Sequence, residues 1–416
     1  MLIHSASQLL TIAGAPQRGA DLGRLGIIPN GAVLIEGETI AAVGTSEELI
    51  QKYPHESSLD VNGRVVMPGL VDPHTHAIWA GDRSAEFEMR LQGKTYMEIM
   101  AAGGGIASTV RATRAAPLKV LLDETRQRLR RMFSYGTTTA EVKTGYGLHS
   151  AAELRILLAL LELDAEGPLE IAATFLGAHA VAPEYLGKTD EYVDLICNTM
   201  LPLVQQWWSN HAPYHTLPFV DVFCEKGVFD LAQSRRILEE ARRLNFPLKI
   251  HADEFENIGG AALAAELGAV SADHLVTTSA EDIRTLAHSN TVAVALPCTP
   301  FGLAETHYTP AREILAEGGL LAIASDLNPG TAWCESMQFA IALACRYLHL
   351  TPAQAIAAAT INAAAAIGRS ERIGSLEPGK QADVLILDIP DYRHLGYRFG
   401  TNLVQSVIKK GKFYPN

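Results

Sequence analysis

Hydrophobic positions along the middle of the chain alternate between two spacings. Short runs rich in β-branched residues are each followed by a polar or glycine-containing loop, and then by a longer stretch whose apolar residues recur at helical spacing. Strands that alternate with helices in this way pair in parallel, because each helix returns the chain to the same end of the sheet. Eight runs fit a strand: residues 65–71, 137–143, 170–177, 219–225, 247–252, 269–274, 291–297 and 320–326.

The stretches between these runs have the features of helices. Residues 150–167 begin with Ser150 as the predicted N-cap, and Glu153 follows three residues later. Residues 231–245 carry an amphipathic pattern that ends near Asn245. Eight strand–helix units predict an α/β fold, a closed TIM-type (β/α)8 barrel.

An open doubly wound sheet is the alternative to a barrel. That fold usually carries a Gly-x-Gly-x-x-Gly turn after its first strand, and no such turn follows residues 65–71. Three glycines occur at residues 103–105, but no predicted strand precedes them. We therefore interpret this segment as a mobile loop in the long first connection rather than as a phosphate site.

The two ends of the chain have a different pattern. Residues 31–44 fit a strand, a tight turn and a second strand, and residues 374–388 and 406–414 also fit short strands. We expect both termini to join in one small β-sandwich beside the barrel; the alternative is that they are edge decorations with no common sheet. The expected domains are residues 1–64 and 374–416 for the sandwich and 65–373 for the barrel.

Composition narrows the class of protein. Hydrophobic residues make up 48% of the chain and charged residues 19%, as in a globular protein with a large core. The net charge of -12 argues against nucleic acid or an anionic membrane as a partner. The five cysteines include no C-x-x-C pair, which argues against a disulfide framework and a thiolate zinc site. Together with the lack of a secretory signal or an apolar run of about 18 residues, this predicts a cytoplasmic protein.

Polar side chains gather where the predicted strands end. In a barrel, the loops at these ends form the active face. A single histidine at such a position is more often a structural side chain than a ligand, so the coincidence at one rim is what indicates a functional site. The residues concerned are His74, His76, Tyr146, His179, His251, Glu254, His274 and Asp326.

Four of these residues have the chemistry of a metal site. His74 and His76 are separated by one residue at a strand end, so their side chains point to the same face. His251 and Asp326 arrive from the fifth and eighth strands. Three imidazole nitrogens and a carboxylate oxygen suit zinc or iron and leave a position for water. Such a metal lowers the pKa of bound water and supplies hydroxide near neutral pH.

Proton transfer needs further groups beside the metal. Glu254 lies beyond the strand that ends at His251, where it is placed to protonate a leaving nitrogen. The alternative for Glu254 is a charge at the N-terminus of the following helix. Asp326 is placed to accept a proton from attacking water, and His274 to orient that water and stabilise an oxyanion.

The motifs that hold these residues resemble a known superfamily. "PGLVDPHTH", "HADE", "DHL" at residues 273–275, "SD" at 325–326 and "GSLEPGKQADVLILD" resemble the metal-dependent amidohydrolases along nearly the whole chain. A narrower resemblance is to the imidazolonepropionase family, through the segment that begins "HTHAIWAGDRSAEFEMRL" and through "EVKTGYGL", "FLGAHAV" and "SDLNPGT". That family hydrolyses the cyclic amide of 4-imidazolone-5-propanoate to N-formimino-L-glutamate in histidine degradation.

The resemblance implies a role for each motif residue. It implies one divalent or trivalent transition-metal ion per subunit, Zn or Fe, bound by His74, His76, His251 and Asp326. It implies catalytic roles for Glu254, His274 and Asp326. It implies a small anionic heterocyclic substrate, and a homodimer as the assembly. The residues that it implies as contacts of substrate or product are Arg83, Tyr146, His179, Asn328, Gly330 and Thr331.

The residue chemistry agrees with an anionic substrate. Arg83 offers a planar fork of donors that pairs with a carboxylate, whereas its alternative interpretation is a surface salt bridge. Many amidohydrolases hold a second metal through a bridging residue, and Glu225 and Lys226 end the fourth strand here. The "HADE" pattern favours one metal, so we assign no catalytic role to Lys226 or Lys143. Two further functions stay open: a related amidohydrolase or deaminase that acts on another small heterocycle, and a non-catalytic barrel scaffold.

Overall fold

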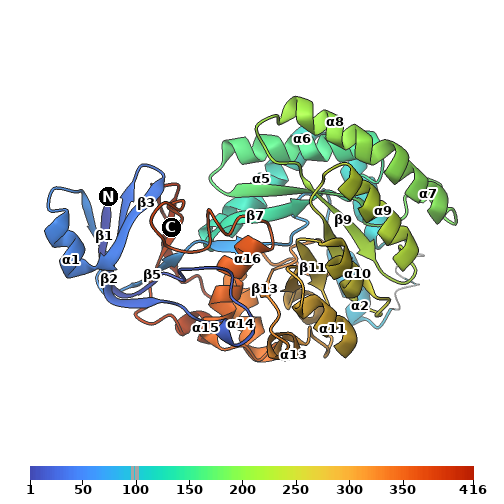
Figure 1. Ribbon diagram of the computed structural model, residues 1–416. Helices are drawn as coiled ribbons and strands as arrows, with labels where there is room; N and C mark the ends of the chain where they lie inside the picture. Colours follow the sequence, from blue (N-terminus) through green and yellow to red (C-terminus); the bar gives the residue numbers. More distant parts are fainter. Residues whose placement is uncertain (95–97, 99–102) are drawn as a thin grey trace.

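A ring of parallel strands forms the larger part of the computed structural model, which describes residues 1–94, 98 and 103–416 (Figure 1). Each strand pairs in parallel with the next along the chain. The strands are β6 (Leu70–Asp72), β7 (Thr137–Lys143), β8 (Glu170–Ala178), β9 (Phe219–Cys224), β10 (Lys249–Ala252), β11 (Ser271–His274), β12 (Val292–Ala295) and β13 (Leu321–Ile323). The predicted (β/α)8 barrel is confirmed.

The first and last barrel strands meet just beyond their carboxyl ends. The backbone N–H of Asp326 donates to the carbonyl of His74 at 3.1 Å, and the N–H of His76 donates to the carbonyl of Leu327 at 2.8 Å. These bonds form a parallel bridge between Thr75 and Leu327, beyond the ends of β6 and β13, and they hold two segments that are more than two hundred residues apart in the sequence. The same bonds close the barrel and bring the first and last predicted ligands together.

The first predicted strand divides into two. Val65–Pro68 forms β5, which pairs with β1 and β14 in the terminal sheet, and the barrel strand β6 begins only at Leu70. Gly69 lies between them, where a Cβ atom would come within 2.3 Å of the side chain of Thr138. The chain passes from one sheet to the other at this position. Glycine is required there because any larger residue would collide with Thr138. The domain limits at residues 64 and 373 stay a prediction.

Helices cover the outside of the barrel (Figure 1). The predicted helix cap at Ser150 is wrong, because the ring of His149 accepts the N–H of Ala152 instead. Glu153 turns back to the loop after β7, where it accepts three backbone N–H groups. None of the described helices is long and apolar enough to cross a membrane. The main helices are α2 (Ser84–Leu91), α4 (Ile106–Ala115), α5 (Leu118–Ser134), α6 (Ser150–Glu166), α7 (Thr189–Leu195), α8 (Leu201–His211), α9 (Leu231–Arg243), α10 (Gly260–Leu267), α11 (Ala280–Ala287), α12 (Cys298–Leu303), α13 (Ala311–Ala316), α14 (Met337–Tyr347), α15 (Pro352–Ala358) and α16 (Ile361–Ala365).

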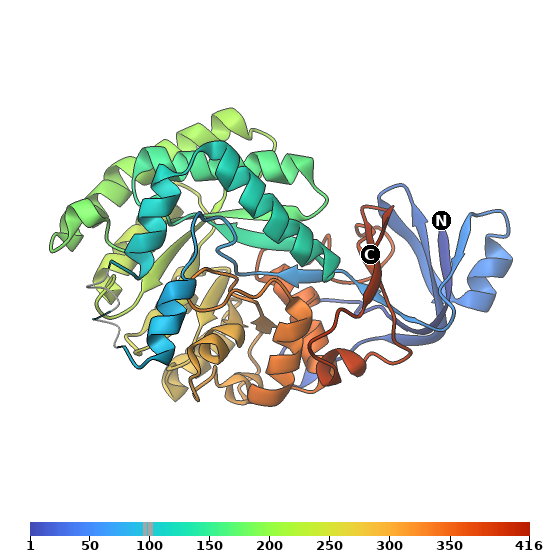
Figure 2. The same cartoon turned by 180° about the vertical axis from the view of Figure 1, so that it is seen from behind.

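Both termini join in one sheet beside the barrel, as Figure 2 shows from behind. The sheet order is β16-β15-β14-β5-β1-β2-β3, with β4 on β1. Residues 38–40 also bond to residues 380–382, so the sheet curls and the two halves share an apolar core. The alternative of separate edge decorations is therefore excluded. The strands are β1 (Leu2–Leu10), β2 (Ile27–Glu36), β3 (Thr39–Thr45), β4 (Ser58–Asp60), β5 (Val65–Pro68), β14 (Val384–Leu387), β15 (Val404–Lys409) and β16 (Lys412–Pro415).

A carboxylate fastens the barrel to this sheet. Glu170 begins β8 and forms ion pairs with Lys409 of β15 at 3.3 Å, with Arg369 at 2.8 Å and with Arg372. Burial by itself raises the pKa of Glu170, but the three cations outweigh it and hold that pKa well below its usual range.

We expect Glu170→Gln to destabilise the fold by about 3 kcal/mol, because it removes the counter-charge of Arg369, although Lys409 keeps its ion pair with Asp383 at 2.7 Å. The measurement is the free energy of unfolding in urea. Glu266→Gln is the matched control, since Glu266 pairs with Arg235 on the exposed surface, and we expect little change there. Equal stability of the two variants would contradict a structural role for Glu170.

Candidate metal centre

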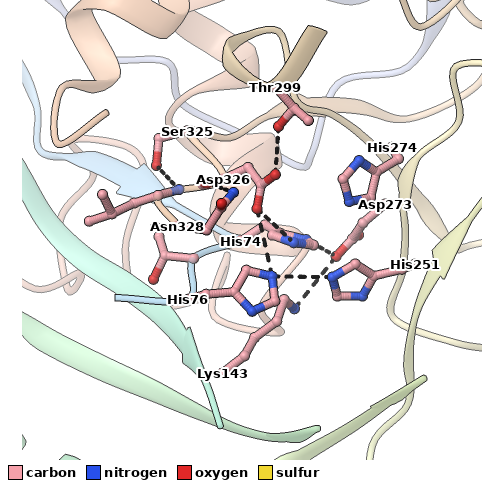
Figure 3. Close-up of polar contacts among 12 residues, drawn as sticks. His74, His76, Lys143, His251, Asp273, His274, Thr299, Ser325, Asp326 and Asn328 are labelled. Atoms are coloured by element: carbon pink, nitrogen blue, oxygen red, sulfur yellow. Dashed lines mark hydrogen bonds and ion pairs between the residues drawn. The ribbon is translucent and has the colours of Figure 1, made fainter. Parts of the chain in front are cut away.

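The four predicted ligands converge at the carboxyl end of the barrel (Figure 3). His74 Nε2 lies 3.5 Å from Asp326 Oδ1, and His76 Nε2 lies 3.6 Å from the same oxygen. The Nε2 atoms of His76 and His251 are 3.3 Å apart. Donor atoms from β6, β10 and β13 thus face one point, although the residues span positions 74 to 326 of the chain.

The unsatisfied atoms at this point fit a cation. His74 Nε2 and Asp326 Oδ1 are buried and have no hydrogen-bond partner among the described residues, whereas buried polar atoms normally have one. Two sets of side chains there have donor atoms within 4.8 Å of one another: His74 with His76 and Asp326, and His74 with His251 and His274. Imidazole nitrogens and a carboxylate oxygen are donors that zinc and iron accept.

Two aspartates orient the ligand imidazoles from behind. His74 Nδ1 lies 2.6 Å from Asp273 Oδ2, and His251 Nδ1 lies 3.0 Å from Asp221 Oδ2. A carboxylate at Nδ1 keeps the proton on that nitrogen, so the lone pair of Nε2 faces the centre. On the last ligand, Asp326 Oδ2 accepts the hydroxyl of Thr299 at 2.5 Å.

Lysines balance these carboxylates within the barrel. Lys143 Nζ lies 2.8 Å from Asp221 and 2.7 Å from Glu141, and Lys249 Nζ lies 3.5 Å from Asp273. All five side chains are fully buried. Burial by itself lowers the pKa of Lys143, but Asp221 and Glu141 raise it above its usual value, so the lysine stays charged.

Sequence reasoning missed the two supporting aspartates as site residues. Asp273 lies in the DHL motif and Asp221 in the predicted strand 219–225, and neither is among the predicted site residues. The available signal was a charged residue inside a buried strand, because such a charge requires a partner in the interior.

Burial favours the neutral, metal-binding form of three imidazoles at the centre. Burial lowers the pKa of His74, His76 and His274 well below the usual histidine value, and the neighbouring cationic groups lower it further. Burial together with His251 lowers the pKa of His179 to about 3.

Glu254 and His274 lie together beside the ligands. Glu254 Oε1 is 3.6 Å from His274 Nδ1. Burial and the charge of Asp326 raise the pKa of Glu254 well above its usual value, which favours the protonated acid. The alternative role of Glu254, as an acid at the N-terminus of the following helix, is filled by its neighbour. Asp253 accepts the N–H of Gly260 at the start of α10.

The predicted substrate residues lie on two sides of the centre. His179 stacks on His76 with ring centroids 4.7 Å apart, and Tyr146 lies 5.3 Å from His179. On the other side, Asn328 Oδ1 accepts the N–H groups of Gly330 and Thr331, each at 2.8 Å. The side chain of Asn328 therefore shapes the turn that follows Asp326.

Arg83 reaches this turn from α2. It occupies the N-cap position of the helix, and its side chain is only 19% exposed. A Cβ atom on Gly330 would lie 2.4 Å from Arg83 Nη1, so the guanidinium occupies the space that a side chain would fill. Arg83 is thus enclosed near the site rather than free on the surface, although it also pairs with Glu86.

The possible bridging residues of a second metal are engaged elsewhere. Glu225 accepts the backbone N–H groups of Phe255 at 2.9 Å and Glu256 at 3.1 Å. Lys226 pairs with Glu256 at the exposed surface. Neither side chain is left to bridge two ions.

A parallel barrel with three imidazoles and a carboxylate at its carboxyl mouth is the architecture of a metal-dependent barrel hydrolase. The profile of the amidohydrolase family matches residues 65–414, and that of the bacterial imidazolonepropionase-like composite domain matches residues 31–55. Over the whole chain, imidazolonepropionases from Herpetosiphon aurantiacus and Chloroflexus aggregans are 50% and 51% identical. The alignments cover 99% of this chain in both cases, and 96% and 97% of those relatives. The chain therefore belongs to the amidohydrolase family and, within it, to the imidazolonepropionases.

Solved structures show the same fold at lower identity. A zinc-bound adenosine deaminase from Xanthomonas campestris superposes with a TM-score of 0.66 and 19% identity. The superposition covers 99% of this chain and 92% of the deaminase. At this identity the likeness supports the barrel and the terminal sheet, and it does not extend to the substrate.

We expect Asp273→Asn to weaken zinc binding by about 10- to 100-fold, because an amide no longer fixes the proton on His74 Nδ1. The measurement is competition with a chromophoric chelator, and circular dichroism checks that the variant is folded. Asp388→Asn is the control, since Asp388 lies on the exposed surface beside Arg64. Unchanged zinc affinity in a folded Asp273→Asn protein would refute the supporting role.

Proposed function

We propose that this protein hydrolyses the cyclic amide of 4-imidazolone-5-propanoate to N-formimino-L-glutamate, as the resemblance to imidazolonepropionases implies. The observation that carries the proposal is the combination of a buried His3Asp cluster with an enclosed arginine that reaches the adjoining turn from α2. The cluster suits hydrolysis of an amide, and the arginine suits a substrate with a carboxylate tail.

His74, His76, His251 and Asp326 would hold one transition-metal ion, Zn or Fe. When bound there, the ion supplies a Lewis acid that lowers the pKa of water toward neutrality. The orphaned atoms His74 Nε2 and Asp326 Oδ1 support this ligand set. The set suits zinc and iron alike, because its donors are nitrogen and oxygen without thiolate.

Asp326 and His274 act on the attacking water. Asp326 accepts its proton, while the hydroxyl of Thr299 keeps the carboxylate in place through Oδ2. His274 is neutral and buried, and it hydrogen-bonds the water and the oxyanion that develops on the ring carbonyl. The left-handed backbone of His274, at φ +79°, turns its side chain at the end of β11.

Glu254 protonates the amide nitrogen as the ring opens. Burial and the charge of Asp326 raise the pKa of Glu254, which favours the protonated acid that donates in this step. Asp326 then releases the proton that it accepted from the attacking water and Glu254 regains one, so both carboxyl groups return to their starting states.

The remaining motif residues bind the substrate. Arg83 pairs with the propionate carboxylate through its two Nη groups. Tyr146 and His179 hydrogen-bond the polar ring from the side of β7 and β8. The turn that Asn328 shapes with Gly330 and Thr331 encloses the substrate opposite them.

The assembly that we propose is a cytoplasmic homodimer that binds neither nucleic acid nor membranes. The net charge of -12 supports the absence of polyanionic partners. The family resemblance and the apolar fraction of 48% support the dimer.

The direct test is loss of the ultraviolet absorbance of 4-imidazolone-5-propanoate in the presence of the purified protein. We expect turnover that disappears after treatment with a chelator and returns with Zn²⁺ or Fe²⁺. Metal analysis of the untreated protein accompanies the assay. Absence of turnover in the metal-loaded protein would overturn the proposal, and ammonia release without ring opening would indicate a deaminase.

Two substitutions separate binding from chemistry. Arg83→Met removes the partner of the carboxylate, so we expect KM to rise by about 100-fold with little change in kcat. Glu254→Gln removes the acid, so we expect kcat to fall by about 100-fold or more with little change in KM. Steady-state kinetics on both variants decides the assignment; the reverse pattern would exchange the two roles, and unchanged constants would remove them.

A further inference from the structure

The guanidinium of Arg83 is held from within its own helix. Arg83 Nε donates to Glu86 Oε2 at 2.8 Å. The two side chains are 19% and 12% exposed, so solvent screens this pair less than an ordinary pair on a helix surface. The bond occupies the Nε edge of the guanidinium and leaves Nη1 and Nη2 for other partners.

The other side of Arg83 is limited by the turn after Asp326. Gly330 presents only its Cα to the guanidinium, because a Cβ there would meet Nη1 at 2.4 Å. Arg90, in the last turn of α2, donates through Nη2 to the carbonyl of Gly330 at 3.0 Å. α2 is therefore fastened to the turn at one end and holds Arg83 at the other.

Three charged side chains of α2 and its N-cap, Arg83, Glu86 and Arg90, carry a net charge of about +1. Arg83 and Arg90 are cationic and Glu86 is anionic; burial and the charge of Arg83 lower the pKa of Arg90, and the charge of Glu86 raises it. Glu86 thus has two possible effects on an anionic ligand. As a charge it repels a carboxylate, whereas as a hydrogen-bond partner it keeps the fork of Arg83 in place. The two effects change KM in opposite directions, so experiment can separate them.

Positioning is the effect that the geometry favours. A free arginine side chain has many rotamers, and fixing it before the ligand arrives removes that entropy loss from binding. The fork must also be coplanar with a carboxylate to form two parallel hydrogen bonds. Glu86 supplies the fixed Nε contact that both requirements need.

We propose that Glu86 is a positioning residue for substrate recognition, which orients Arg83 so that its two Nη groups receive the substrate carboxylate. This inference rests on the proposed function, in which Arg83 binds the propionate. Glu86 itself does not touch the substrate.

The test compares KM for 4-imidazolone-5-propanoate in variants of the metal-loaded enzyme. Glu86→Ala should raise KM by about tenfold, with kcat within about twofold, because the contact to Nε is lost. Glu86→Gln should restore KM to within about threefold of the wild type, because the amide oxygen still accepts from Nε. Glu86→Met, which keeps the volume of the side chain, replaces the alanine variant if that variant does not fold.

A double variant shows whether Glu86 acts through Arg83. In the Arg83→Met background, Glu86→Ala should cause no further rise in KM, whereas a general structural effect would persist and add. Glu88→Ala is the matched control on the same helix, since Glu88 is exposed and its carboxylate accepts a hydrogen bond from the side chain of Gln92. We expect its KM to equal that of the wild type.

The outcomes distinguish this inference from the function on which it rests. If Arg83→Met raises KM but Glu86→Ala leaves it unchanged or lowers it, Glu86 is not a positioning residue and the function stands. If Arg83→Met leaves KM unchanged, the role of Arg83 itself fails. A further measurement is inhibition by 3-(imidazol-4-yl)propanoate and by its carboxamide. Glu86→Ala should weaken inhibition by the carboxylate compound and leave inhibition by the carboxamide unchanged.

Discussion

The buried charges inside the barrel are the constraint on which the centre depends. Asp221 and Asp273 each lie behind a predicted ligand imidazole, and each is paired with a lysine from another barrel strand, Lys143 or Lys249. An unpaired charge in this interior would cost several kcal/mol, so the network has little freedom to rearrange. The positions and tautomers of His74 and His251 follow from that rigidity.

Closure of the barrel completes the ligand set. His74 and Asp326 lie just beyond the first and last barrel strands, and the backbone bond between them is one of those that close the barrel. A fold that left the sheet open would separate them by its full width. The centre is therefore a product of the tertiary fold as a whole, and any change that loosens the contact between the ends of β6 and β13 acts on the predicted ligands directly.

Much of this arrangement could be predicted from the sequence, because strand periodicity and strand-end chemistry are local. The run at 137–143 matched β7 at both ends, and His74, His76, His251 and Asp326 were all predicted to converge. The split at Gly69 could not be predicted, since it depends on Thr138 of a neighbouring strand. The partner of a buried aspartate is likewise a tertiary fact, which is why Asp221 and Asp273 were missed. Glu86 has the sequence pattern of an ordinary acid in the first turn of a helix.

In the proposed reaction, the carboxylate of the substrate can compete with the ring carbonyl for the metal ion. The distribution of charge around the site opposes this competition. Beside the predicted ligands, the four carboxylates of Asp221, Asp273, Asp326 and Glu141 equal in number the four positive charges of the two lysines and a divalent ion. The excess of positive charge lies instead on Arg83 and Arg90, at the turn containing Gly330. Because a carboxylate is drawn to the less compensated cation, the propionate goes to Arg83 and the ring carbonyl is left to face the centre. Electrostatics thus sets the direction in which the substrate enters, and hydrogen bonds then fix its position.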